Sequence, residues 1–274
     1  MKKFLALLLA LTMVLALAAC NGGNTDPSTE ATNPSTEGTE GTEGTEGTEG
    51  TEPGSDVQVM THDQFVAAEL DTAVVVETYV QAVESWYNGA CHIYAQSEDG
   101  GYYIYSYSCT EEEAAKLVPG TKIRVSGYKG EWSGEVEIME ATIEILEGTY
   151  TATATDVTAL MGTDALADHM NALVSFKGLT VAASTKKDDD TEYAFLYSWD
   201  GSGEAGKSDL YFNVTDGTTT YTFTINMYMI GTGPDSDVYK AVESLKIGDK
   251  IDLEGFLYWY NGAQTHVTAV TPAA

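Results

Sequence analysis

Alternating apolar and polar positions predict a chain made mainly of β-strands beyond residue 55. Runs of β-branched and aromatic residues lie between Gly-containing turns, of which Asn88-Gly89 is the clearest hairpin signal. Thr110 and Glu113 have the spacing of a capping box and predict a short helix between the third and fourth strands. The predicted strands of this first half cover residues 74–85, 90–97, 102–108, 121–128 and 135–146.

A sequence repeat predicts that the second half has the same fold as the first. The segment Leu117-Val-Pro-Gly-Thr-Lys-Ile-Arg-Val-Ser-Gly-Tyr128 recurs as Leu245-Lys-Ile-Gly-Asp-Lys-Ile-Asp-Leu-Glu-Gly-Phe256, and two copies of one fold are the simplest cause. The pattern of the second half predicts helices at 156–170 and 237–245, strands at 173–183, 193–198, 210–214, 221–226, 250–258 and 264–271, and a polar insertion at 200–209.

One helix between the third and fourth of five strands is the element order of the OB-fold, a small, partly open barrel. We therefore predict a mainly β protein with two tandem OB-fold-like five-stranded barrels (β-β-β-α-β-β), each preceded by a short helix. The predicted domains are residues 55–148 and residues 149–274, the second with an inserted loop and an extended hairpin.

The first residues predict export and lipid attachment. Met1-Lys-Lys, an apolar run and Leu17-Ala-Ala-Cys20 resemble a lipoprotein signal peptide of residues 1–19 followed by Cys20, and this resemblance implies diacylation of Cys20 and an extracytoplasmic location on the cell membrane. An ordinary signal peptide followed by a stray cysteine is the alternative. Residues 20–54, with their Thr-Glu-Gly triplets, have nothing to bury and predict a disordered tether, or alternatively an acidic tail that binds a partner.

The net charge restricts the partners. The chain has 42 acidic against 13 basic residues, a formal charge of −29, and such a field repels phosphate groups, so we expect no nucleic-acid partner. Acidic loops at 188–190 and 200–204 lack the EF-hand pattern, although Ca²⁺ binding there stays open. The four histidines stand alone, which argues against zinc. We predict no cofactor and no metal, and the sequence leaves the oligomeric state open.

Three short motifs carry a resemblance to a known family. Leu-x-x-Gly-x-Lys-Ile-x-Val-x-Gly, Trp-Tyr-Asn-Gly and Glu-Trp-Ser-Gly-Glu are similar to segments of tandem OB-fold lipoproteins of Gram-positive gut bacteria. The resemblance extends over most of the chain beyond Asp56 and implies the fold and the location. It supplies no catalytic residues, because those proteins are largely uncharacterised.

Aromatic residues are the candidate ligand contacts. OB-folds bind on the face of strands 2 and 3, between the 1–2 and 4–5 loops, and indole or phenol rings there can stack on sugar rings. The alternative for the strand tyrosines is structural, since aromatic cross-strand pairs also stabilise sheets. The candidates are Trp86, Tyr87, Tyr94, Tyr105, Trp132, Trp199, Trp259 and Tyr260.

Two cysteines of the body can form a disulfide. A hairpin turn at Gly100 places Cys91 directly opposite Cys109, and facing positions of antiparallel strands accept a disulfide in an exported protein. We predict this bond, the alternative being two reduced, buried thiols.

The chain contains none of the usual catalytic motifs, and we therefore expect it not to be an enzyme. The preferred hypothesis is a tethered binding module for a neutral glycan or a peptide. The second hypothesis is a structural or interaction lipoprotein that recruits another cell-envelope protein.

Overall fold

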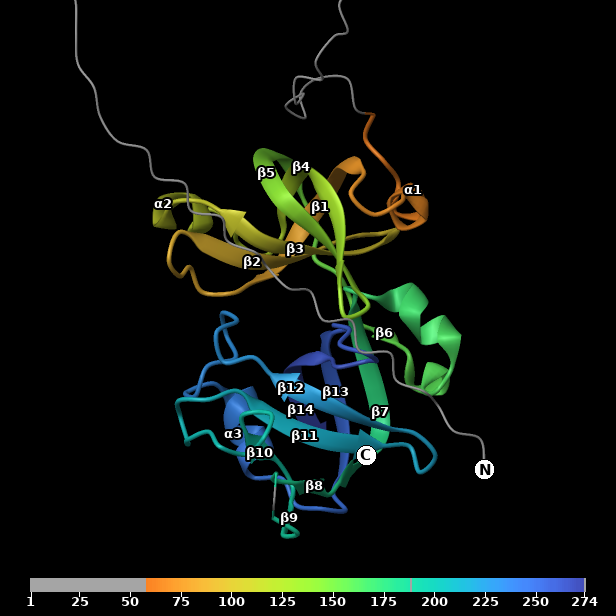
Figure 1. The fold of residues 1–274 in the computed structure, drawn as a ribbon, viewed down its shortest axis with the longest axis vertical. Helices are drawn as coiled ribbons and strands as arrows, with labels where there is room; N and C mark the ends of the chain where they lie inside the picture. Colours follow the sequence, from red (N-terminus) through yellow and green to blue (C-terminus); the bar gives the residue numbers. More distant parts are fainter. Residues whose placement is uncertain (1–57, 188, 274) are drawn as a thin grey trace, which may run out of the picture. The chain divides into compact units, whose positions relative to one another are not determined.

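The computed structural model describes residues 58–187 and 189–273, and in these ranges it contains two β-barrels. Barrel 1 is the orange to green part of Figure 1. Its five strands follow the closed order β1-β2-β3-β5-β4, in which β3 and β5 run parallel and all other neighbours run antiparallel. The bounds are α1 (His62–Ala67), β1 (Ala73–Val83), β2 (Ala90–Ser97), β3 (Gly100–Ser108), α2 (Glu111–Ala114), β4 (Thr121–Trp132) and β5 (Glu135–Thr149).

Barrel 2 repeats this order. Its strand β7 pairs with both β11 and β13, β14 lies between β12 and β13, and only the β12–β14 neighbours of the ring run parallel. The bounds of the ring and its helix are β7 (Leu173–Ala182), β11 (Leu210–Thr215), β12 (Thr220–Ile225), α3 (Asp237–Glu243), β13 (Lys250–Phe256) and β14 (His266–Pro272). The predicted fold class, two OB-fold-like barrels, is therefore confirmed.

Short elements surround the second ring (Figure 1). They are β6 (Thr155–Asp156), which adds to β7, the 3-10 helices η1 (Thr158–Leu160) and η2 (Asp164–His169), and, in the connection between β7 and β11, β8 (Ser184–Thr185), β9 (Glu192–Tyr193) and β10 (Leu196–Tyr197). The stretch predicted as one helix at 156–170 is two 3-10 turns, and the strand predicted at 193–198 is two short pieces outside the ring. Val157, Leu160 and Met161 have helical spacing, but the chain turns at Gly162, whose φ of +75° lies outside the helical region, and the predicted helix is divided there.

Local sequence explains where the helices begin. Thr110 accepts from the backbone N of Glu113, while the Glu113 carboxylate accepts from the backbone N of Thr110 at 2.8 Å, which is the predicted capping box. Ser236 caps α3 in the same way through the backbone N of Tyr239. Each helix thus satisfies part of its free N–H groups before the following strand begins.

Each barrel has its own apolar core, because inward-facing positions of its strands alternate with outward-facing positions. In barrel 1 the core includes Val76, Ile104 and Ile123, and in barrel 2 it includes Phe176, Phe212 and Phe223, where all six side chains are fully buried. A third, smaller cluster joins the barrels and consists of Tyr94, Tyr103, Met229 and Phe256.

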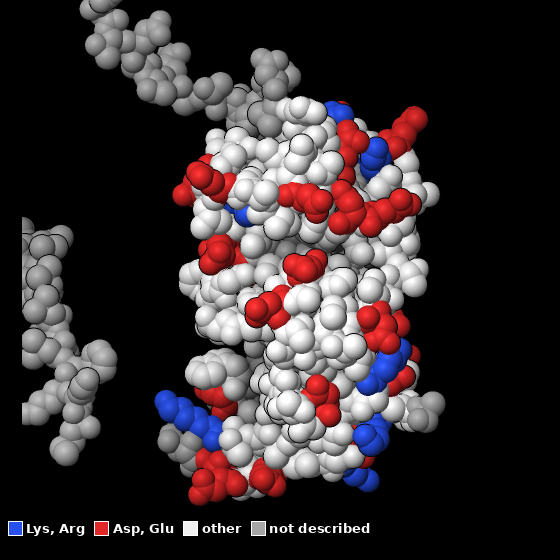
Figure 2. Space-filling model, turned by 90° about the vertical axis from the view of Figure 1, so that its right-hand side faces the viewer, with Lys and Arg blue, Asp and Glu red and all other residues white. Residues whose placement is uncertain are grey.

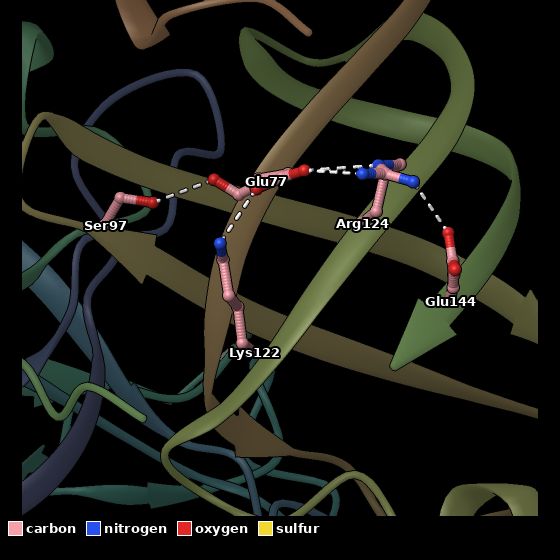
Figure 3. A network of polar contacts seen from close by, with 5 residues as sticks. All are labelled: Glu77, Ser97, Lys122, Arg124 and Glu144. Carbon is pink, nitrogen blue, oxygen red and sulfur yellow. Dashed lines mark hydrogen bonds and ion pairs between the residues drawn. The ribbon is translucent and has the colours of Figure 1, made fainter. Parts of the chain in front are cut away.

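An ion-pair network lies on the outer surface of barrel 1 (Figure 3). Glu77 on β1 pairs with Lys122 and Arg124 on β4 at 2.8 Å each, and Arg124 also pairs with Glu144 on β5 at 2.8 Å. Hydrogen bonds from Lys122 and Arg124 lower the pKa of Glu77. Arg124 is the only arginine of the chain, and carboxylates of its own sheet hold it in place.

The predicted signal peptide, Cys20 and the tether lie outside the described residues. Within 58–187 and 189–273, no helix is long and apolar enough to cross a bilayer.

Candidate binding site

The outer face of β2 and β3 in barrel 1 packs against barrel 2. Tyr94 stacks on Phe256 with ring centroids 4.6 Å apart, and its hydroxyl is 2.9 Å from Nδ1 of His266. Tyr103 lies beside Tyr94 and meets the ring of Tyr258 edge to face. The face that an OB-fold usually offers to a ligand is thus largely covered in barrel 1 by its neighbour.

The 4–5 hairpin tips of the two barrels also contact each other. The backbone N of Asn261 donates to the carbonyl of Ser133 at 2.7 Å, and the backbone N of Trp259 donates to Oε2 of Glu135 at 2.6 Å. A Cβ at Gly134 would lie 2.8 Å from Cδ1 of Trp259, and φ at Gly134 is +91°. Both the close contact and the backbone angle favour glycine at this position. The Glu-Trp-Ser-Gly-Glu motif at 131–135 and the second Trp-Tyr-Asn-Gly motif, at 259–262, were both expected to contact a ligand, and they contact one another.

A cavity of about 660 Å³, called here the interbarrel pocket, opens beside these contacts. Six of its lining residues are aromatic, and the others are polar. The aromatic residues are Tyr103 and Trp132 of barrel 1 and Trp199, Tyr211, Tyr258 and Tyr260 of barrel 2. The polar residues are Asp209, Thr222, Thr224, Asn226, Gln264 and His266. Its position corresponds to strands 2 and 3 and the flanking loops of barrel 2, where OB-folds bind their ligands.

The polar groups of the interbarrel pocket are held by short hydrogen bonds. Oδ1 of Asp209 accepts from the backbone N of Met227 at 2.9 Å, and Nδ2 of Asn226 donates to Oε1 of Glu84 at 2.7 Å. Thr224 is 3% exposed, and its hydroxyl has no hydrogen-bond partner among the described residues. Such an orphaned group is costly unless something else satisfies it.

Burial shifts the titration of the acidic groups at and behind the pocket. It raises the pKa of Glu84 to about 7, that of Glu135 to about 8 and that of Glu137 to about 6, and it raises the pKa of Asp209 above its ordinary value. None of these four carboxyls forms an ion pair with a lysine or arginine in the described ranges. Carboxyls without a positive partner are therefore concentrated where the barrels meet.

His266 is the one basic side chain of the pocket lining. Burial lowers its pKa to about 4, so the ring is neutral at physiological pH, and Nδ1 already contacts the Tyr94 hydroxyl. His266 therefore supplies no positive charge to the neighbouring carboxyls.

The structure brings three of the eight aromatic candidates into the interbarrel pocket. They are Trp132, Trp199 and Tyr260, which are 62%, 73% and 48% exposed and lie at its rim. Each comes from a loop or a hairpin tip, and Trp132 belongs to a different barrel from the other two.

The other candidates lie elsewhere. Tyr94 is 1% exposed, so its expected ligand contact is wrong; the ring is buried because it packs between the barrels. Trp259 packs against the core of barrel 2. Tyr105 is half exposed beside His92, and Nε1 of Trp86 donates to the carbonyl of Cys109 at 2.8 Å. Tyr87 lines a separate hollow of about 610 Å³ that is formed by barrel 1 and by Tyr228 of barrel 2.

Cys91 and Cys109 are free thiols with their Sγ atoms 3.8 Å apart. The register that we expected is wrong, because Cys91 faces Tyr107, and the pairing shifts by one residue at a bulge between Cys91 and Ile93. Their side chains still meet, so the disulfide stays a prediction.

No cluster of three or more His, Cys, Asp or Glu side chains that could hold a metal ion is found in the described residues. In the acidic loops, Asp189 and Asp200 accept hydrogen bonds from the backbone N of Thr191 and Ser202, respectively. These carboxylates stabilise their own turns.

Sequence reasoning missed several residues of the pocket. Asp209 ends the predicted insertion, Asn226 ends the strand predicted at 221–226, and Tyr258 and His266 lie in the strands predicted at 250–258 and 264–271. All four belong to barrel 2, whose folding brings these distant positions together. The alternation within a single strand carries no signal for this.

The comparisons with known proteins concern the fold. No family model and no curated protein matches the chain. A murine DNA-binding protein bound to double-stranded DNA is 13% identical over 73% of this chain and 96% of its own, with a TM-score of 0.34. The HINa domain of Ifi202 in complex with 20-bp double-stranded DNA is 12% identical over 74% of this chain and 100% of its own, with a TM-score of 0.31. A replication protein A heterotrimer bound to single-stranded DNA is 9% identical over 81% of this chain and 70% of its own, with a TM-score of 0.26.

Two expectations are corrected by these comparisons. The charge argument excluded nucleic acid, and the aromatic loop residues were interpreted as contacts for a neutral glycan or a peptide, with recruitment of an envelope protein as the second hypothesis. Solved structures similar to this chain contain DNA, so both predictions are wrong. What those proteins bind is a property of those proteins, and at such identities and TM-scores it does not transfer to this chain.

Proposed function

We propose that this protein is a non-enzymatic binding protein that holds a small molecule in the interbarrel pocket. The observation that carries the proposal is the pocket itself, about 660 Å³ with six aromatic side chains and a few polar groups. Cavities of this size and composition are typical of small-molecule sites. The orphaned hydroxyl of Thr224 adds a polar group in the lining that lacks a partner in the protein.

The position of the pocket on barrel 2 supports the same proposal. Tyr211 on β11 and Thr222 on β12 line its floor, Trp199 comes from the connection between β7 and β11, and Tyr260 comes from the connection between β13 and β14. These four places are strands 2 and 3 and the 1–2 and 4–5 loops of an OB-fold. Barrel 1 contributes Trp132 as a wall, so both barrels are needed to form the site.

The lining supports binding rather than catalysis. It includes no serine, cysteine or lysine, and its histidine is held by the Tyr94 hydroxyl. Asp209 hydrogen-bonds the backbone N of Met227, and among the described residues its carboxylate forms no hydrogen bond with a hydroxyl of the lining. The groups present can stack on a ligand and hydrogen-bond it.

The four tryptophans of the chain allow a direct test by fluorine NMR of protein labelled with 5-fluorotryptophan. Two of them, Trp132 and Trp199, line the pocket, whereas Trp86 lies on barrel 1 outside it. We expect a pocket ligand from a diverse fragment set to shift the Trp132 and Trp199 resonances together and to leave Trp86 unchanged. Single Trp→Phe variants assign the resonances.

Two results contradict the proposal. The first is a fragment set in which nothing shifts Trp132 and Trp199. The second is a single-stranded oligonucleotide that shifts Trp86 as much as the pocket tryptophans, because an extended ligand across both barrels would then replace a small molecule in one pocket.

The location of the protein is a separate part of the proposal. The Leu17-Ala-Ala-Cys20 motif and the Thr-Glu-Gly tether support attachment to the outside of the cell membrane through Cys20. Metabolic labelling with a palmitate analogue in a bacterial host tests it. The label is expected on the wild-type chain and absent from Cys20→Ala, and an unlabelled wild-type chain contradicts the attachment.

A further inference from the structure

The interbarrel pocket has an unbalanced charge. Asp209 is the only charged residue of its lining, and no lysine or arginine of the described ranges pairs with it. Its Oδ1 accepts one backbone hydrogen bond, from Met227 at 2.9 Å. A half-buried carboxylate prefers a positive partner, and residues 58–187 and 189–273 do not supply one.

A second carboxyl lies directly behind the lining. Oε1 of Glu84 accepts a hydrogen bond from Nδ2 of Asn226 at 2.7 Å. Asn226 directly precedes Met227, whose backbone N donates to Asp209. Two carboxyls from different barrels are therefore attached to consecutive residues at one end of the pocket. Neither forms an ion pair with His266, which is buried and whose Nδ1 lies 2.9 Å from the Tyr94 hydroxyl.

The walls of the pocket suit the same kind of ligand. Six aromatic side chains line the space. Tyr258 already stacks on His266, whereas Trp132, Trp199 and Tyr260 are exposed at the rim. The face of an aromatic ring is negative and attracts a cation within about 6 Å. Groups of aromatic rings are the usual sites for alkylated ammonium groups. A neutral ligand would gain the stacking but would leave Asp209 without a partner.

The net negative charge of the whole protein also favours a cationic ligand. The chain carries a formal charge of −29, and in Figure 2 acidic residues are spread over both barrels, whereas basic residues lie mainly toward the edges of this view. Such a field raises the local concentration of small cations around the protein.

We propose that the ligand of the interbarrel pocket is a small organic cation, with an alkylated ammonium group held between the aromatic walls and facing the carboxylate of Asp209. This inference rests on the proposed function, because it names the chemical class that the pocket takes. The orphaned Thr224 hydroxyl and the Gln264 amide are available for a polar group elsewhere on the same molecule.

Matched pairs of ligands that differ in charge but hardly in shape test the inference on the full chain. Choline is compared with 3,3-dimethylbutan-1-ol, and benzyltrimethylammonium with neopentylbenzene, each titrated while the fluorotryptophan resonances are followed. We expect each cation to shift Trp132 and Trp199 at concentrations at least about tenfold lower than its neutral counterpart, a difference of about 1.4 kcal/mol.

Asp209→Asn provides the matched variant, because the amide oxygen can still accept from Met227 while the charge is removed. It is expected to weaken binding of the cation at least about tenfold and to leave binding of the neutral counterpart within about twofold. Asp216→Asn is the control. Asp216 also accepts backbone hydrogen bonds, from Thr218 and Thr219, but lies outside the pocket, so cation binding should not change.

Failure of this inference is distinguishable from failure of the proposed function. Equal binding of the charged and neutral members of a pair overturns the organic cation and leaves a small-molecule site in place. The same holds if neutral fragments shift Trp132 and Trp199 and no cation does. If neither a cation nor any fragment shifts these resonances, both proposals are wrong.

Discussion

The Tyr94 hydroxyl of barrel 1 and Nδ1 of His266 of barrel 2 are 2.9 Å apart, although 172 positions separate them in the chain. Both residues are buried, and Tyr94 also stacks on Phe256. The outer face of β2 and β3 in barrel 1 is therefore an interface, while the corresponding face of barrel 2 stays open as the wall of the interbarrel pocket. Two barrels with the same element order have thus taken different roles.

Removing the Tyr94 hydroxyl is expected to destabilise the protein. In Tyr94→Phe the ring can still stack on Phe256, but Nδ1 of His266 loses its partner in a buried position, which costs about 1–3 kcal/mol. Urea unfolding followed by tryptophan fluorescence measures the change. Tyr105→Phe is the control, because Tyr105 is 45% exposed, and it should stay within about 0.5 kcal/mol of the wild type. Equal stabilities of the two variants would show that the Tyr94–His266 contact contributes nothing.

Gly134→Ala is expected to weaken the contact between the hairpin tips. Gly134 and Gly217 have similar backbone angles, with φ of +91° and +98°, so alanine pays a similar conformational cost of about 1 kcal/mol at both. At Gly134 the added Cβ would also lie 2.8 Å from Cδ1 of Trp259, whereas at Gly217 no atom lies within 4 Å. Thermal unfolding should therefore show a clearly larger loss for Gly134→Ala. Equal losses would mean that the hairpin tip moves freely away from Trp259.

The element order could be read from the sequence because it depends on local signals. Strand β2 and the capping box of α2 follow from alternation, the Asn88-Gly89 turn and the Thr-x-x-Glu spacing, and the repeated Leu-x-x-Gly-x-Lys-Ile segments located the second barrel. The ring order then follows from the fold. These features involve residues that are close together in the chain.

The site could be predicted only in part, because it is formed by contacts between distant residues. Trp132, Trp199 and Tyr260 were found because exposed aromatic residues in loops stand out in any sequence. Tyr94 looked equally suitable, and only the packing of barrel 2 against its ring shows that it is covered. Asp209 gave no signal, since its importance comes from the lack of a basic neighbour in three dimensions.

The two thiols are expected to form a disulfide under oxidising conditions. Their Sγ atoms are 3.8 Å apart and the residues are 18 positions apart, so the bond would close a loop that stabilises the fold by about 3 kcal/mol. Burial raises the pKa of Cys91 to about 12, and because the thiolate is the reactive form, oxidation should speed up as the pH rises. Intact mass, with Cys109→Ser as the control, follows the loss of two hydrogens. Urea midpoints that do not differ with and without reductant would contradict the stabilisation.

Stability should fall as the pH rises through the titration of Glu135. This side chain is fully buried, Oε2 accepts from the backbone N of Trp259, and Oε1 has no partner among the described residues. Burial raises its pKa to about 8, against about 4.5 for the unfolded chain. Between these values the folded state binds more protons than the unfolded state, so its contribution is complete below pH 4.5 and is lost as the pH approaches 8.

Glu135→Gln isolates this contribution, because the amide has nearly the same shape and carries no charge. The variant should lose much of the decrease in unfolding free energy that the wild type shows between pH 7 and 9, measured by urea unfolding at each pH. His266 does not interfere there, since its pKa of about 4 makes it neutral in the folded protein and its unfolded value lies near 6.5. Glu137→Gln is the control, because the pKa of Glu137 is raised only to about 6, and it should keep the decrease above pH 7. A Glu135→Gln profile parallel to that of the wild type would show that Glu135 is charged in the folded protein throughout this range.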